Sequence, residues 1–104
     1  MTPIYRWNGE YFGFFNNSGY FFNATSDYLG WITEDGRVWH ANGQFMGELV
    51  DEHYILRRTS MATPATRAAR AHPATPAIPA RRANRAGRTD RAGYVDALNE
   101  FESA

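Results

Sequence analysis

A repeat with a period of seventeen residues constrains this chain more than any other feature. The motif Tyr11-Phe12-Gly13 returns as Tyr28-Leu29-Gly30 and then as Phe45-Met46-Gly47, each time seventeen residues later. A second motif keeps the same period and occurs as Ile4-Tyr5, Phe21-Phe22, Val38-Trp39 and Ile55-Leu56. One unit of this size cannot bury its apolar face alone, so the units are expected to pack into one body.

Each unit is predicted to be a β-hairpin. Asn8-Gly9 and Asn42-Gly43 are dipeptides of type I′ turns, because both residues tolerate the positive φ that these turns require. The other expected turns are Asn17-Ser18-Gly19 and Glu34-Asp35-Gly36, and the less typical Thr25-Ser26 and Asp51-Glu52. Aromatic and β-branched runs lie between the turns. The pattern predicts an all-β fold with about seven short antiparallel strands.

Alternation along these strands places apolar residues on both faces of the predicted sheet. Ile4 and its equivalents share one face, and Tyr5 and its equivalents share the other. Fourteen of the sixteen aromatic residues lie in residues 1–58. So thin a sheet cannot bury them all, and we expect cover from another subunit, the chain's own tail or a ligand. The mid-strand Gly13, Gly30 and Gly47 mark either bulges that bend the sheet or a close approach of another group.

The hairpin units YFGFFNNSGYFF, YLGWITEDGRVW and FMGELVDEHYIL, followed by a Pro- and Arg-rich triplet tail, resemble the bacterial 4-fold β-flower proteins. The resemblance implies a small all-β domain of petal-like hairpins with pseudo-fourfold symmetry, and it implies no activity. His53 stands where other units have a turn Gly, so the last petal is expected to be irregular. The aromatic hairpins are also similar to choline- and glucan-binding repeats, whose longer period and secreted context argue against that assignment.

The chain divides into three predicted parts: a β-hairpin repeat domain (1–58), an extended Ala/Pro/Arg segment (59–93) and a C-terminal amphipathic helix (94–104). The formal net charge is zero, but residues 1–58 sum to −3 and residues 59–104 to +3. Tyr94, Leu98 and Phe101 are spaced i, i+4, i+7, which predicts a helix near 94–102.

The middle segment has a period of three. Ala recurs at every third residue from Ala62 to Ala86, and Pro or Arg recurs at every third residue from Pro64 to Arg91. Polyproline II has three residues per turn, so this sequence would make straight columns of like residues. Three interpretations remain open: a disordered linker, an extended strand whose Ala column packs on the hairpins while Arg residues stack or pair with acidic turns, and a nucleic-acid-binding arm of charge +6 across 62–91.

No motif names a reaction. The chain has no Cys and no HExxH, P-loop, GxSxG or EF-hand pattern, so we expect a non-enzymatic protein without a metal or cofactor. Candidate ligand-stacking residues are Trp7, Trp31 and Trp39. Arg6, Asn23, His40 and Arg57 share one repeat position, where they either form a polar ring for an anion or are solvated.

The expected function is therefore a structural or protein-interaction module that self-associates. The alternatives are binding of carbohydrate or another small ligand on the aromatic face, and binding of nucleic acid through Arg67 to Arg91. A cytoplasmic location without membrane contact is expected, because no signal peptide and no apolar run of about eighteen residues is found.

Overall fold

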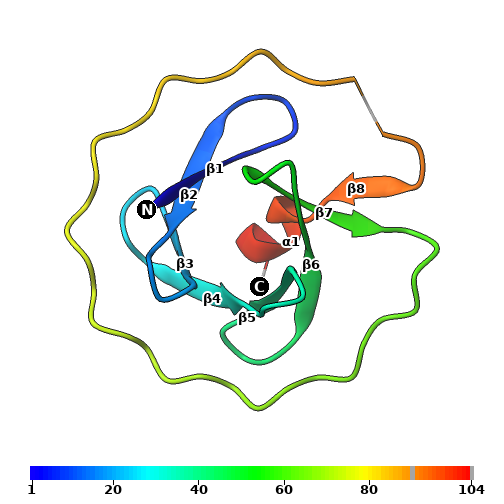
Figure 1. Ribbon diagram of the computed structural model, residues 1–104, viewed down its shortest axis with the longest axis horizontal. Helices are drawn as coiled ribbons and strands as arrows, with labels where there is room; N and C mark the ends of the chain where they lie inside the picture. Colours follow the sequence, from blue (N-terminus) through cyan, green and yellow to red (C-terminus); the bar gives the residue numbers. More distant parts are fainter. Residues whose placement is uncertain (90, 104) are drawn as a thin grey trace.

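The computed structural model describes residues 1–89 and 91–103, with side chains for 1–89, 91–99 and 101. Eight strands form one antiparallel sheet in sequence order, and the sheet curls around a central helix (Figure 1). The elements are β1 (Thr2–Tyr5), β2 (Tyr11–Phe15), β3 (Tyr20–Asn23), β4 (Tyr28–Ile32), β5 (Arg37–His40), β6 (Phe45–Val50), β7 (Tyr54–Arg58), β8 (Tyr94–Asp96) and α1 (Leu98–Ser103). The prediction of an all-β hairpin fold is confirmed.

The strands pair into four hairpins, which we call petals 1 to 4: β1–β2, β3–β4, β5–β6 and β7–β8. Tight turns close the first three, whereas residues 59–93 connect the two strands of petal 4. Petal 4 also contacts petal 1, because the backbone N–H of Tyr5 donates to the carbonyl of His53 at 2.8 Å. The His53 ring lies 2.8 Å from the carbonyl oxygen of Pro3 through Nδ1.

The mid-strand glycines combine both predicted roles. The register shifts between Ile4 and Tyr5, which pair with Gly13 and Tyr11, so Phe12 is the extra residue of a β-bulge. A Cβ on Gly13 would lie 2.0 Å from the carbonyl oxygen of Phe22 in the next petal. The residue after the bulge must therefore be glycine, because the backbone of the next petal leaves no room for a side chain at position 13.

The first apolar column fills the centre of the molecule. Ile4, Phe21, Val38 and Ile55 are all 0% exposed and belong to one buried cluster with Leu98 and Phe101 of α1. The Phe21 and Phe101 rings meet edge to face, with centroids 5.3 Å apart. The helix thus covers the inner face of the curled sheet (Figure 1).

The structure corrects the predicted start of the C-terminal helix. Tyr94–Asp96 form β8, which pairs with β7, and α1 begins only at Leu98. Without β8, β7 would be an open edge strand with unpaired backbone groups. Asp96, the last residue of β8, caps the start of α1: its carboxylate accepts a hydrogen bond from the Leu98 backbone N–H at 3.0 Å.

Residues 62–89, which we call the strap, surround the sheet as a single extended trace (Figure 1). The strap contains no helix or strand. Its Ala column is exposed, whereas Pro64, Pro73, Pro76 and Pro79 are half-buried. The expectation that the Ala column packs on the hairpins is therefore wrong. The Pro/Arg column faces the sheet instead, because its larger side chains reach the aromatic rings that Ala is too short to contact.

Candidate functional site

Arginines of the strap lie over aromatic rings of petals 2 and 3. The Arg67 guanidinium is 4.5 Å from the Trp39 ring centroid, and that of Arg70 is 4.6 Å from the Trp31 centroid. Both residues also form backbone hydrogen bonds with petal 3. The N–H of Arg67 donates to the carbonyl oxygen of Gly43 at 2.9 Å, and the N–H of Arg70 donates to that of Ala41 at 3.2 Å. Each arginine thus combines a main-chain hydrogen bond with a cation–π contact.

The same arrangement recurs at petal 1. Arg85 lies 4.4 Å from the Tyr5 centroid, and Arg88 lies 5.1 Å from Trp7 and 4.5 Å from Tyr54. The backbone N–H of Arg85 donates to the carbonyl oxygen of Gly9 at 2.7 Å, and that of Arg88 donates to the carbonyl oxygen of Trp7 at 3.0 Å. Arg88 also pairs with Asp51 in the β6–β7 turn at 2.6 Å.

The two sites relate the period of the strap to the period of the petals. Gly9 and Gly43 are thirty-four residues apart, which is two petals, whereas Arg67 and Arg85 are eighteen residues apart, which is six triplets. Three triplets therefore span one petal. The strap reaches petal 3 first and petal 1 last, so it runs around the sheet against the sequence order of the petals.

Petal 2 has a different contact with the strap. Pro76 and Pro79 stand nine residues after Arg67 and Arg70, at the corresponding positions of the triplet repeat. The turn also differs, since Ser26 takes the glycine position with φ 64° and its hydroxyl donates to the Ala77 carbonyl at 3.4 Å. Changes in the petal thus coincide with changes in the strap.

The strap covers two of the three candidate stacking residues. Trp31 and Trp39 are each 1% exposed, and their rings carry the guanidinium groups of Arg70 and Arg67. Trp7 is half-buried, and its indole N–H donates to the Thr89 carbonyl at 2.9 Å. Neither Trp31 nor Trp39 offers an open ring face to a ligand in this arrangement.

The four residues of the predicted polar ring have different surroundings. Arg6 donates to Asn99 at 3.1 Å, and His40 stacks on Phe101 with centroids 5.8 Å apart. Asn23 donates to Asp27 at 3.0 Å, and Arg57 donates to Thr63 at 2.8 Å. Helix α1 occupies the axis on which these side chains were expected to converge (Figure 1). Burial lowers the pKa of His40 below its ordinary value.

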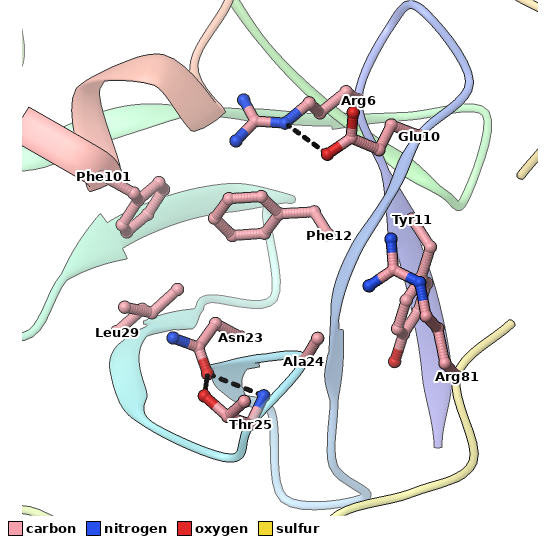
Figure 2. Close-up of a pocket in the computed structure, with 10 residues that line it drawn as sticks. All are labelled: Arg6, Glu10, Tyr11, Phe12, Asn23, Ala24, Thr25, Leu29, Arg81 and Phe101. Carbon is pink, nitrogen blue, oxygen red and sulfur yellow. Dashed lines mark hydrogen bonds and ion pairs between the residues drawn. The ribbon is translucent and has the colours of Figure 1, made fainter.

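A pocket of about 340 Å³ opens between petals 1 and 2, the strap and α1 (Figure 2). Phe12, Leu29 and Phe101 form its apolar part. The polar side chains around it are Arg6, Glu10, Asn23, Thr25 and Arg81, with Arg6 and Glu10 3.8 Å apart. Tyr11 also lines the pocket, and burial raises its pKa. The sequence analysis named Arg6 as a candidate, but for a polar ring, and it did not single out Arg81, which comes from the strap and lies outside the Pro/Arg column.

No group of three or more His, Asp or Glu side chains is arranged to hold a metal ion among the described side chains of residues 1–89, 91–99 and 101. Within residues 1–89 and 91–103, no helix is long and apolar enough to cross a membrane.

Comparison with curated proteins and with solved structures finds no match. A family model described as 4-fold beta flower protein matches residues 2–99, which is nearly the whole chain. The match agrees with the repeated hairpins around one centre, and the chain belongs to the 4-fold β-flower family.

Proposed function

We propose that this protein is a non-enzymatic structural module, in which a C-terminal strap closes over a pseudo-fourfold flower of aromatic hairpins. In this role it presents a fixed body to protein partners, including further copies of itself. The observation that carries the proposal is the repeated pairing of strap arginines with petals, at Arg67 and Arg70 and again at Arg85 and Arg88.

The strap has the properties of an intramolecular cover. Cation–π contacts at exposed sites contribute about 0.5–1 kcal/mol each. The strap is therefore held by several weak contacts together and not by a single strong one. With the strap in place, the large hydrophobic side chains left exposed in the described part of the chain are Met1, Ile78 and Val95. Cover in cis therefore accounts for the aromatic surplus that the sequence contains.

We infer a polyproline II conformation for the strap, because it would explain the period of three. Three residues per turn place every third side chain on one side, so one column of Pro and Arg can face the petals. The same conformation has no internal hydrogen bonds, which leaves the N–H groups of Arg67 and Arg85 free to donate to the petal turns.

Replacing the four arginines tests the proposal without removing any strand. Cutting the chain after Arg58 would delete β8 and α1 together with the strap, so exposure of the core would be confused with loss of the cover. In the full chain with Arg67, Arg70, Arg85 and Arg88 all changed to Gln, we expect acrylamide to quench indole fluorescence more strongly. Light scattering should show a larger mean mass than that of the native chain.

Arg82→Gln is the matched control, because Arg82 belongs to the same column but has no cation–π contact among the described residues. It should leave both quenching and mass unchanged. A fourfold variant with native quenching and native mass at every protein concentration would show that the arginines do not cover the flower, and the proposal would be abandoned.

Binding of nucleic acid is a second candidate, favoured by one observation. Arg67, Arg70, Arg85 and Arg88 remain exposed while they lie over the rings, so the edges of their guanidinium groups can still meet phosphates. Retention of the full chain on single-stranded DNA or RNA at low salt, lost steeply as salt rises, would support it. Failure to bind either polymer at low salt would exclude it.

A further inference from the structure

The pocket between petals 1 and 2 combines an apolar floor with a guanidinium group that the strap brings to it. Phe12 of β2, Leu29 of β4 and Phe101 of α1 supply flat and branched apolar surface. Arg81 of the strap also lines the pocket, and Figure 2 shows its guanidinium beside Tyr11, across β2 from Leu29 and Phe101. Four segments, namely β2, β4, α1 and the strap, therefore build one concave site.

Arg81 supplies a positive charge beside the apolar floor. Among the described residues that line the pocket, the carboxylate is that of Glu10, which pairs with Arg6 at 3.8 Å. In the described part of the chain, Arg81 has a contact with the Tyr11 ring at 5.7 Å and no carboxylate within ion-pair distance. A cation at the edge of an apolar pocket favours a ligand that carries a negative charge next to an apolar body.

Tyr11 also lines the pocket, but its hydroxyl is buried below the surface, in a cluster with Tyr5 and Tyr54, so a ligand would not reach it. The donor that a ligand carboxylate would meet is the Arg81 guanidinium, which can donate two parallel hydrogen bonds.

We infer that this pocket binds a small organic carboxylate with a flat apolar body, such as an aromatic acid. The apolar body would lie against Phe12, Leu29 and Phe101, and the carboxylate would face Arg81. The pocket volume of about 340 Å³ is at the lower end of the range of small-ligand sites, which suits a single ring. This binding activity goes beyond the structural role proposed above, but it requires the strap in place because the strap carries Arg81.

Titration of the full chain with sodium benzoate at constant ionic strength, followed by backbone amide NMR, tests the inference. We expect saturable shifts that are largest around Phe12, Thr25 and Leu29. Two reference compounds separate the parts of the ligand: neutral benzamide, which lacks the charge, should bind at least about tenfold more weakly, and inorganic phosphate, which lacks the apolar body, should cause no saturable shift there.

Two variants and one matched control locate the site. Arg81→Gln should weaken benzoate binding about tenfold, the effect expected for one charge-assisted hydrogen bond. Ala24→Leu should block the pocket sterically, because Ala24 lines it. Arg70→Gln removes another strap arginine with a ring contact but no place in the pocket, and should leave benzoate binding unchanged.

Three results would overturn the inference: no saturable shift with benzoate, equal binding of benzamide or phosphate, or native benzoate affinity in both Arg81→Gln and Ala24→Leu. Each variant is scored only on samples whose amide spectrum matches that of the native chain outside the pocket, so loss of binding through unfolding is excluded. A native-like Ala24→Leu keeps the test decisive if Arg81→Gln disturbs the strap.

Discussion

The backbone N–H of Arg85 donates to the carbonyl oxygen of Gly9 at 2.7 Å, and a Cβ on Gly9 would lie only 1.9 Å from the Arg85 carbonyl oxygen. Gly9 therefore serves two purposes at the tip of petal 1. Its φ of 95° closes the turn, and its missing side chain leaves room for the strap. Gly43 has the same relation to Arg67.

Substitution of Gly9 separates these two purposes. Gly9→Ala and Gly36→Ala both place Ala at positive φ, a cost of about 1–2 kcal/mol. A Cβ on Gly36 meets nothing within 4 Å, whereas one on Gly9 meets the strap. We expect Gly9→Ala to cost about 1 kcal/mol more in the free energy of unfolding, because it also breaks the Arg85 hydrogen bond. Urea denaturation measures both, and equal losses would show that the strap does not rest on Gly9.

Removal of the Phe101 ring tests whether α1 completes the core. Phe101 is 4% exposed and contacts Phe21 and His40. Phe101→Ala should reduce the free energy of unfolding by about 3–5 kcal/mol, as for other large-to-small changes in cores. Val95→Ala is the control, since Val95 is 46% exposed and should change stability by less than about 0.5 kcal/mol. Similar stabilities for the two variants would mean that the sheet folds without α1.

Stability should fall as the pH drops below the ordinary pKa of histidine. Burial lowers the pKa of His40 in the folded state, so the unfolded chain binds the proton more readily. Its contribution is complete above a pH of about 6.5 and declines as the pH falls toward the lower, folded-state pKa. His40→Gln removes this group, and chemical denaturation at pH 7.5 and 5.5 should show a smaller difference than in the native chain. An unchanged difference would assign the pH dependence to other groups.

The repeat made most of the sheet predictable. A period of seventeen with Asn8-Gly9 and Asn42-Gly43 at the tips defines β1 to β7 through local turn preferences, which need no knowledge of distant contacts. The second strand of the fourth petal, β8, was missed because thirty-five residues separate it from β7 and it pairs only through the tertiary fold. Tyr94 and Val95 have good strand propensity, but their spacing with Leu98 and Phe101 also fits a helix.

The candidate site was less predictable because it depends on where the strap lies. A period of three shows that one column faces the petals, yet it does not say which column, and Ala was the wrong choice. Arg81 is one of seven arginines in residues 62–91, and it is the one that lies outside the Pro/Arg column. That irregularity alone does not show that it lies beside petal 2. The pairing of Trp31 with Arg70 likewise joins residues thirty-nine positions apart, which no local pattern encodes.

Limited trypsin digestion should reveal which part of the strap is held least firmly. Arg67, Arg70, Arg85 and Arg88 are bound through their backbone N–H groups, whereas between Arg70 and Arg85 no backbone–backbone hydrogen bond joins the described residues of the strap to the sheet. Proteolysis requires local release of the chain, so the first cleavage is expected after Arg81 or Arg82. Because β7 and β8 pair within the sheet on either side of the strap, the two fragments should remain associated. Mass spectrometry under denaturing and native conditions identifies the cut and the complex. First cleavage after Arg67 or Arg85, or immediate separation of the fragments, would contradict this order of anchoring.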